Sequence, residues 1–214
     1  MDPHEQITAI VPLKALAAAK QRLAAALDAS TRRDLVAWMF SRVVAACHAA
    51  PRLTRLLVVA GDDEAAALAI HHGAEAFVEP AGGLSGAIRA ADTRLGCSAD
   101  SLVVVADLPL LTAEDLDAVC TAAAPGPSVT VAPTVDGGTG ALLRRPGTVI
   151  QPAFGPQSAA RHLGAGRTAG ASTAVVERGG FALDVDDEAD LRIAEARIPD
   201  LGGLRPHVPN GRVV

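Results

Sequence analysis

Short apolar runs alternate with helix-forming segments through the first half of this chain, and this alternation constrains the fold more than any other feature. Strands are predicted at Ile7–Pro12, Arg55–Ala60, Ala74–Val78 and Leu102–Asp107. Helices are predicted between and after them, at 15–27, 31–50, 63–72, 83–95 and 113–123. Runs that are apolar without alternation are typical of strands buried on both faces, so the pattern predicts a parallel sheet with right-handed crossovers.

The pattern changes after Pro125. A strand is predicted at Ser128–Ala132, and a turn-rich loop over Thr134–Gly140 can return the chain as an antiparallel strand at Ala141–Arg144. A helix at 156–164, a strand at 173–177 and a helix at 188–197 complete the domain. We therefore expect an α/β fold, an open, mostly parallel sheet with antiparallel additions. Residues 1–198 form one domain in this interpretation, and residues 199–214 form an extended Pro/Gly-rich tail.

Composition excludes several classes of function. Half of the 214 residues are apolar and the formal charge is −5, which argues against non-specific binding of nucleic acid. Cys47, Cys97 and Cys120 lack metal-ligand spacing and resemble small core residues of a reduced, cytoplasmic protein. No signal peptide and no membrane-spanning run is predicted. The oligomeric state is left open, with a homodimer as one option.

Asp107 is the first candidate functional residue. It ends the Leu102 strand, because Pro109 cannot continue a ladder and holds Leu108 extended. Open α/β sheets bind ligands at the carboxyl ends of their strands. The next helix has its own cap in Thr112, with Asp115 three residues on, so Asp107 is available for a ligand or a metal.

A second group of carboxylates lies at Asp184, Asp186 and Asp187. On an extended segment Asp184 and Asp186 point the same way while Val185 turns inward. Asp186 or Asp187 can cap the helix that follows, but a cap does not explain Asp184. Together with Asp107 the pair would form an all-oxygen site suited to Mg²⁺.

Basic and glycine-rich segments lie beside the predicted strand ends. Lys14, Lys20 and Arg22 follow the first strand, where cations would meet phosphates, although a solvated helix face is the simpler interpretation of these three alone. The chain has neither a P-loop nor a G-x-G-x-x-G after that strand. Glycine-rich segments at 82–86 and 137–141 leave backbone N–H groups accessible, and Gly155–Ser158 begins a helix that would form an anion site.

These segments, in this order, resemble one family. The motifs IVPLK, AKQRL, ADLPLL, DGGTGALL, FGPQSAARHL and LDVDDEADL are similar to those of the phospho-carboxylate guanylyltransferases of deazaflavin coenzyme F(420) biosynthesis, CofC and FbiD. The similarity covers about Ile7 to Ala196. It implies a three-layer nucleotidyltransferase fold, GTP as the donor, and 2-phospho-L-lactate, phosphoenolpyruvate or 3-phosphoglycerate as the acceptor.

The resemblance also implies roles for single residues. Asp107, Asp184 and Asp186 match the metal-binding aspartates, and Gly155 and Ser158 match acceptor-binding positions. The turn at Thr139 and Ala141 would complete the acceptor site, although relatives often carry a hydroxyl residue where Ala141 stands. Gly83 and Ser85 would contact the nucleotide, with Ser85 replacing a common Asn. Lys14, Lys20 and Arg22 would hold the triphosphate, with Lys14, Lys20 and Asp107 acting in catalysis.

Two other functions compete with this interpretation. Another nucleotidyltransferase, such as a molybdopterin guanylyl- or cytidylyltransferase or a sugar-phosphate enzyme, usually carries a glycine-rich loop where this chain has Pro12-Leu13-Lys14. A non-catalytic nucleotide-binding module would use the aspartates only as caps and the glycines only as turns. The position of three acidic residues and two anion-binding loops at strand ends favours the enzyme.

Overall fold

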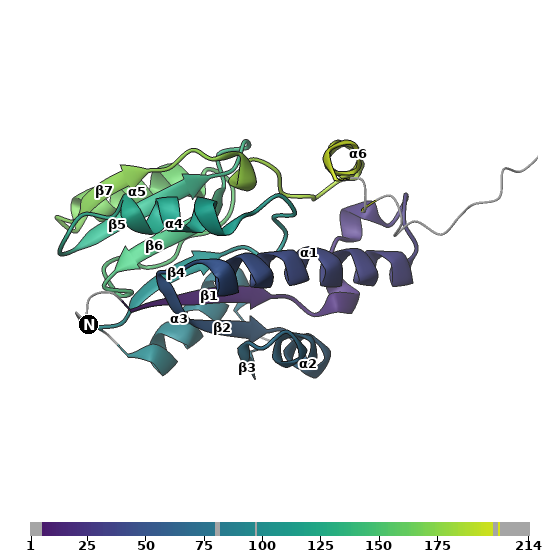
Figure 1. Cartoon of the computed structure of the whole chain (residues 1–214), viewed down its shortest axis with the longest axis horizontal. Helices are drawn as coiled ribbons and strands as arrows, with labels where there is room; N and C mark the ends of the chain where they lie inside the picture. Colours follow the sequence, from purple (N-terminus) through teal and green to yellow (C-terminus); the bar gives the residue numbers. More distant parts are fainter. Residues whose placement is uncertain (1–5, 80–81, 97, 199–200, 202–214) are drawn as a thin grey trace, which may run out of the picture.

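The computed structural model describes residues 6–79, 82–96, 98–198 and 201, and its centre is a seven-stranded sheet. The strands are β1 (Ile7–Leu13), β2 (Leu53–Ala60), β3 (Glu75–Val78), β4 (Asp100–Val104), β5 (Ser128–Pro133), β6 (Thr139–Arg145) and β7 (Ser172–Val175). Their order across the sheet is β3-β2-β1-β4-β6-β5-β7. Figure 1 shows this order, with β7 near the top and β3 at the bottom.

Pairing within the sheet confirms the predicted mixed topology. β1 pairs in parallel with both β2 and β4, and β2 pairs in parallel with β3. β6 is antiparallel to β4 and to β5, and β7 is parallel to β5. The hairpin predicted around 134–140 therefore places an antiparallel strand inside the sheet, next to β4, rather than at its edge. This insertion brings Thr139, at the start of β6, to the carboxyl edge of β4.

Helices cover both faces of the sheet, as the three-layer prediction requires. They are α1 (Ala29–Ala49), α2 (Asp63–His71), α3 (Gly83–Leu95), α4 (Ala113–Thr121), α5 (Ser158–Thr168) and α6 (Glu188–Arg197). Alternate residues of one strand enter different cores: Ala9 and Val11 pack with α1, whereas Ile10 packs with α3. The first core also contains α2, α4 and α6 residues, and the second contains residues of α5. This alternation is the direct result of the two-residue side-chain period of a strand.

The predicted helix at 15–27 is wrong. The segment instead forms two short 3₁₀ turns, η2 (Leu16–Ala18) and η3 (Gln21–Leu23), separated by Lys20 in the left-handed conformation with φ 51°. Alanine-rich propensity is a weak preference that tertiary contacts override. Here Leu16, Ala19 and Leu23 are buried, and the irregular path turns Lys20 toward two carboxylates described below.

Several element boundaries also differ from those predicted. α1 begins before the predicted residue 31 and is capped by Asp28, whose carboxylate accepts the Thr31 N–H. β4 ends at Val104 rather than near Asp107, and α5 begins at Ser158 and runs past Gly164. The predicted cap of α4 at Thr112 is confirmed as a full capping box with Asp115, and Asp62 caps α2.

Two further predictions concern the cysteines and the tail. Cys47 and Cys120 are buried free thiols, and burial raises the pKa of each to about 12, so they behave as small core residues. Cys97, and the tail from 199 onward except Leu201, lie outside the described residues. Among the helices of the described chain, none has the length and apolar character that crossing a bilayer requires.

Candidate active site

The predicted site residues converge at the carboxyl edge of the sheet. β1, β2 and β4 all end there, and the β5–β6 hairpin reaches the same edge because the Val105 N–H donates to the Gly140 carbonyl. A cavity of about 640 Å³ opens at this edge. Its polar lining residues include Lys14, Lys20, Arg22, Glu79, Asp107 and Asp186.

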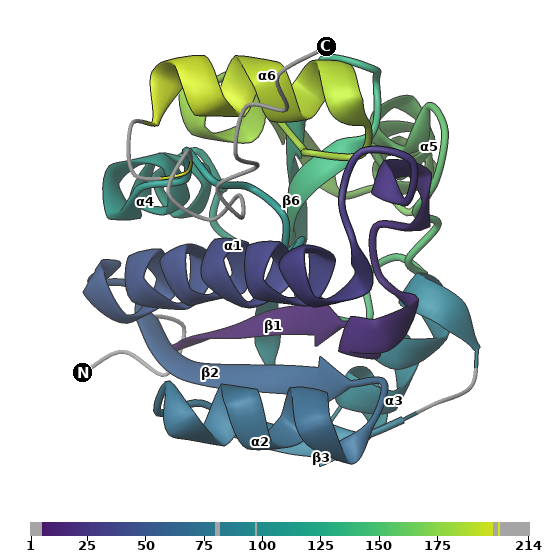
Figure 2. The same ribbon diagram turned by 90° about the vertical axis from the view of Figure 1, so that its right-hand side faces the viewer.

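Lys20 joins the two predicted carboxylate segments. Its Nζ donates to Asp107 Oδ2 at 2.5 Å and to Asp186 Oδ1 at 2.8 Å, although Lys20 and Asp186 are 166 positions apart in the chain. Figure 2 shows how this occurs: the purple segment after β1 rises from the sheet edge toward one end of α6. Burial alone lowers the pKa of Lys20, but attraction to the two carboxylates outweighs it and the pKa is raised. The ammonium therefore stays charged at neutral pH.

Asp184 belongs to the same cluster, and its acidity is clearly perturbed. Burial, followed by the nearby negative charges of Asp107 and Asp186, raises the pKa of Asp184 to about 6. Val185 is fully buried between Asp184 and Asp186, as the extended-segment prediction required. Asp187, not Asp186, caps α6, which leaves the Asp186 carboxylate free to face Lys20 and Arg22. Lys20 thus links Asp107 to Asp186, and the charges of both aspartates act on Asp184.

The donor chemistry of this group suits a hard cation, but its present arrangement is not a ready metal site. Within residues 6–79, 82–96 and 98–198, no three His, Cys, Asp or Glu side chains are grouped closely enough to hold a metal ion. The Lys20 ammonium takes the position of a cation between Asp107 and Asp186. Asp107 and Asp186 already attract one cation, and Asp184 is a third carboxylate whose pKa is raised by burial and by their charges. Carboxylate oxygens are the ligands that Mg²⁺ prefers.

The predicted nucleotide-binding residues are only partly brought together. Lys14 is exposed, and with Arg22 and Gly83 it lines the cavity that contains Lys20. Gly83, at the start of α3, has φ 60°, a left-handed conformation that favours glycine. Ser85 lies in the first turn of α3 and is not among the residues that line the cavity, although its neighbours Gly83 and Leu84 are.

The predicted acceptor residues form a buried hydroxyl network instead of an open pocket. Thr139 Oγ1 lies 2.8 Å from Ser158 Oγ and 3.1 Å from His162 Nδ1, and all three residues are at most 4% exposed. The Ala153 N–H donates to His162 Nε2, so Nδ1 carries the proton of the neutral ring. Burial lowers the pKa of His162 to about 4, which keeps the ring neutral at physiological pH.

The start of α5 is also less open than its sequence predicts. The Ser158 N–H donates to the Gly155 carbonyl and the Ala159 N–H to the Gly137 carbonyl, so both helix-start donors have partners within the chain. Gly155 itself is exposed, with φ 123°, and Ala141 is fully buried in β6. The two glycine-rich loops that the sequence predicts as anion sites therefore pack against each other.

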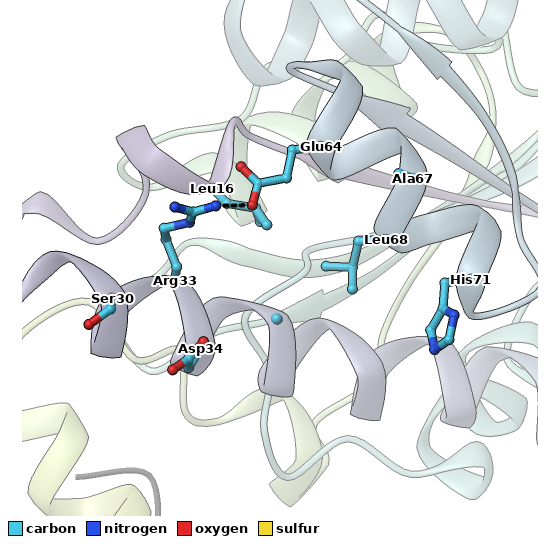
Figure 3. Close-up of a pocket in the computed structure, with 9 residues that line it drawn as sticks. Leu16, Ser30, Arg33, Asp34, Glu64, Ala67, Leu68 and His71 are labelled. Atoms are coloured by element: carbon cyan, nitrogen blue, oxygen red, sulfur yellow. Dashed lines mark hydrogen bonds and ion pairs between the residues drawn. The ribbon is translucent and has the colours of Figure 1, made fainter. Parts of the chain in front are cut away.

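A second hollow, of about 490 Å³, lies between α1 and α2, and none of the predicted site residues lines it (Figure 3). Arg33 and Glu64 point toward each other across it and form an ion pair. Leu16 and Leu68 supply apolar lining, and His71 marks its far end. An ion pair between the two helices explains this surface as a helix–helix contact.

Sequence reasoning missed three residues of the site. Glu79 lines the cavity, His162 holds the Thr139 hydroxyl, and Asp136 contributes a negative charge that acts on Asp184 and Asp186. In the sequence, Asp136 lies in a turn-rich loop and His162 in a predicted helix, and neither position indicates a functional role. Only Glu79 carried a usable signal, because it directly follows a strand whose carboxyl end faces the ligand edge.

Comparison with known proteins agrees with this geometry. Residues 7–195 match the protein family described as "Guanylyl transferase CofC like". A phosphoenolpyruvate guanylyltransferase of Sphaerobacter thermophilus is 38% identical over 194 residues, covering 89% of this chain and 93% of the relative. A phosphoenolpyruvate guanylyltransferase of Nocardia farcinica is 34% identical over 230 residues, covering 100% of this chain and 100% of the relative.

Solved structures share the fold at low sequence identity. A nucleotidyl transferase from Methanothermobacter thermautotroptrophicus superposes with a TM-score of 0.67 at 15% identity, covering 91% of this chain and 98% of that one. A CMP:2-keto-3-deoxy-manno-octonic acid synthetase, solved with CTP, gives a TM-score of 0.61 at 11% identity, covering 90% and 99%. These neighbours confirm the predicted nucleotidyltransferase architecture.

Proposed function

This chain belongs to the CofC-like guanylyl transferase family and is a nucleotidyltransferase, and from that membership we propose that it transfers GMP from GTP to phosphoenolpyruvate. A phosphate oxygen of the acceptor attacks the α-phosphorus of GTP. The new bond joins the two phosphates, the bond between the α- and β-phosphates breaks, and pyrophosphate leaves. The resemblance to the enzymes of coenzyme F(420) biosynthesis supports a role in that pathway, and the use of these two metabolites fits a cytoplasmic enzyme.

The observation that carries this proposal is the cavity at the sheet edge, where Lys14, Lys20 and Arg22 face Asp107 and Asp186. The attacking phosphate is already ionised at neutral pH, so the reaction needs no general base. Its main obstacle is the repulsion between two polyanions, which positioned cations overcome. Lys20 is held in place by two carboxylates, and Lys14 is exposed at the mouth of the same cavity, so both can contact a triphosphate.

We further propose that Asp107, Asp184 and Asp186 hold Mg²⁺ when the nucleotide binds. The ion would supply neutralisation of phosphate charge in the transition state. Support comes from the cationic group that already lies between Asp107 and Asp186, and from Asp184, which precedes Asp186 by two residues across the buried Val185. Lys20 would then direct its ammonium toward the phosphates instead.

For the acceptor we retain Thr139, Ala141, Gly155 and Ser158 as the proposed site. Gly155 is exposed, whereas the Thr139 and Ser158 hydroxyls are buried and bonded to each other. Binding of the acceptor carboxylate to Ser158 therefore requires the segment 152–157 to shift. His162 links that segment to β6, through the Ala153 N–H and the Thr139 hydroxyl.

Pyrophosphate release tests the proposal. The purified chain is incubated with Mg²⁺, GTP and either phosphoenolpyruvate, 2-phospho-L-lactate or 3-phosphoglycerate, and the guanylylated product is identified by mass spectrometry. We expect release with GTP and phosphoenolpyruvate, and loss of it in Asp107→Asn. Asp117 lies on α4 and forms an exposed ion pair with Arg52, so Asp117→Asn is the matched control and should retain activity. Turnover with CTP or UTP but not GTP, or with none of the acceptors, would overturn the proposal.

A further inference from the structure

Two of the carboxylates that the proposed metal site would use already bind a cation that belongs to the chain. Lys20 Nζ lies 2.5 Å from Asp107 Oδ2 and 2.8 Å from Asp186 Oδ1. Both contacts are hydrogen bonds as well as ion pairs, and such charge-assisted bonds are among the stronger ones in proteins. To coordinate these two oxygens, a divalent cation has to displace the Lys20 ammonium.

The burial of the three side chains shows how this competition arises. The Lys20 side chain is 8% exposed, whereas the side chains of Asp107 and Asp186 are 29% and 49% exposed. A cation from solution can therefore reach both carboxylates. It meets them with their charge already compensated from the protein side, because the ammonium is the buried partner of each pair.

The Lys20 side chain has a second direction in which it can point. Its backbone is held between the buried residues Ala19 and Leu23, so the ammonium moves by rotation of its flexible four-carbon stem. The same side chain lines the cavity of about 640 Å³ at the sheet edge. A phosphate bound in that cavity would therefore offer the ammonium a new anionic partner when it leaves the two carboxylates.

The cations around the cavity distinguish a free metal ion from a metal–nucleotide complex. Lys14, Lys20 and Arg22 all line it, and Arg22 Nη1 lies 3.8 Å from Asp186 Oδ2. These side chains repel a free divalent cation. The complex of a divalent cation with a nucleoside triphosphate carries a net negative charge, so the same side chains attract it.

We propose that Lys20 is a tethered counter-ion that excludes free divalent cations from Asp107 and Asp186, so that the metal enters this site only as its complex with a nucleoside triphosphate. The inference rests on the proposed function, in which these aspartates hold Mg²⁺ when GTP binds. Lys20 then has two alternative partners, the carboxylates in the free chain and the phosphates in the loaded chain. Metal and nucleotide therefore bind cooperatively, and this coupling is reciprocal.

A purely structural ion pair is the main competing role, because Lys20 joins the segment after β1 to Asp107 and Asp186. The two roles differ in what Lys20→Met does to metal binding. A structural pair predicts a loss of stability and no gain in affinity for a free cation. A counter-ion predicts that the affinity for a free cation rises although the stability falls.

The experiment titrates Mn²⁺ into the nucleotide-free chain and measures the unbound ion by electron paramagnetic resonance. We expect Lys20→Met to bind Mn²⁺ about 10- to 100-fold more tightly than the wild-type chain, the size of coupling between close charges. Lys14→Met removes an exposed lysine from the same cavity and should change the affinity by less than about fivefold. Adding Asp107→Asn to Lys20→Met should abolish the gain, which assigns the bound ion to this site.

The wild-type chain gives a second test that does not depend on the folding of a variant. Calorimetry measures its affinity for GTP without acceptor, once in excess Mg²⁺ and once in EDTA. We expect GTP to bind at least about 10-fold more tightly with Mg²⁺. Mg²⁺ alone, at the same concentration, should leave the urea midpoint of the nucleotide-free chain unchanged.

Outcomes separate this inference from the proposed function. If the nucleotide-free wild-type chain and Lys20→Met bind Mn²⁺ equally well, Lys20 does not exclude the ion and the inference is wrong, whatever the turnover of GTP. A gain that persists in the double variant with Asp107→Asn, or equal GTP affinity with and without Mg²⁺, would also overturn it. If GTP is not turned over with any acceptor, the proposed transfer fails, whereas the Mn²⁺ affinities still decide the role of Lys20.

Discussion

Replacing Lys20 by methionine tests the electrostatic centre of the site most directly. The Lys20 side chain is 8% exposed and donates to Asp107 and Asp186, whose side chains are 29% and 49% exposed. Methionine keeps most of the apolar stem and removes the charge. The two carboxylates would then lie beside Asp184 without the cation that separates them.

The expected loss of stability follows from the burial of the three groups. Removing one partner of a fully buried ion pair costs about 3–5 kcal/mol, whereas exposed pairs contribute about 0–1 kcal/mol. Because the lysine is buried and both carboxylates reach solvent, we expect an intermediate loss of about 2 kcal/mol. With a urea dependence of about 2 kcal/mol per M, the unfolding midpoint should fall by about 1 M.

The pH dependence has a definite sign. Burial raises the pKa of Asp186, but the charge of Lys20 outweighs it, and the pKa is lowered overall. Asp186 therefore stabilises the fold above its unfolded-state pKa of 3.8, and this stabilisation is lost as the pH falls through its folded-state pKa. Lys20 has a raised pKa and stabilises the fold below its unfolded value of 10.5. The difference between wild type and Lys20→Met should therefore be largest near pH 7 and shrink as the pH falls toward 3.

Urea unfolding followed by circular dichroism at several pH values measures this difference. Lys14→Met removes an exposed lysine from the same edge and should change the free energy of unfolding by less than about 0.5 kcal/mol. A Lys20→Met loss that stays constant from pH 7 to pH 3 would refute the reasoning. In that case the lost packing of the side chain, and not its charge, would carry the stability.

Three further predictions follow from the same site. Because the pKa of Asp184 is raised to about 6, its ionised form is unfavourable in the folded chain, so Asp184→Asn should unfold at higher urea than wild type at pH 7 but not below pH 4. Gly61→Ala should weaken GDP binding by about 10-fold in calorimetry, because its Cβ would displace the Ala15 backbone next to Lys14. The pKa of His162 is lowered to about 4, so between pH 6.5 and pH 4 the unfolded chain binds a proton that the folded chain does not, and the free energy of unfolding falls with pH. His162→Asn should flatten this slope in urea titrations. It should also lower the free energy of unfolding at pH 7 by about 2–3 kcal/mol, because the hydrogen bonds of the ring are lost.

The strand-end residues were predictable because a parallel sheet aligns its carboxyl ends. Asp107, Asp186 and Lys14 follow predicted extended segments, and the structure brings all three to one cavity. The paired spacing of Asp184 and Asp186 around buried Val185 also follows from the two-residue period of an extended chain. These features depend on local pattern and topology, both of which are visible in the sequence.

The acceptor region was less predictable, because its contacts depend on how two loops pack. Gly155–Ser158 has the composition of an open helix start, but the Gly137 and Gly155 carbonyls satisfy the Ala159 and Ser158 N–H groups. A Cβ on Gly137 would lie 2.6 Å from the Gln157 side-chain nitrogen, which shows how closely the two loops approach. Periodicity and propensity carry no information on such a contact between segments about twenty positions apart.

Lys20 shows why the same limit affects the catalytic cluster. Its surroundings, Ala-Ala-Ala-Lys-Gln-Arg-Leu, have high helix propensity, yet the residue adopts a left-handed conformation at φ 51°. A non-glycine residue in that region costs about 1 kcal/mol or more, and two ion-paired hydrogen bonds to Asp107 and Asp186 can offset this cost. The conformation of the segment after β1 is therefore set by acidic residues that follow it by 87 and 166 positions, and a local pattern cannot contain that information.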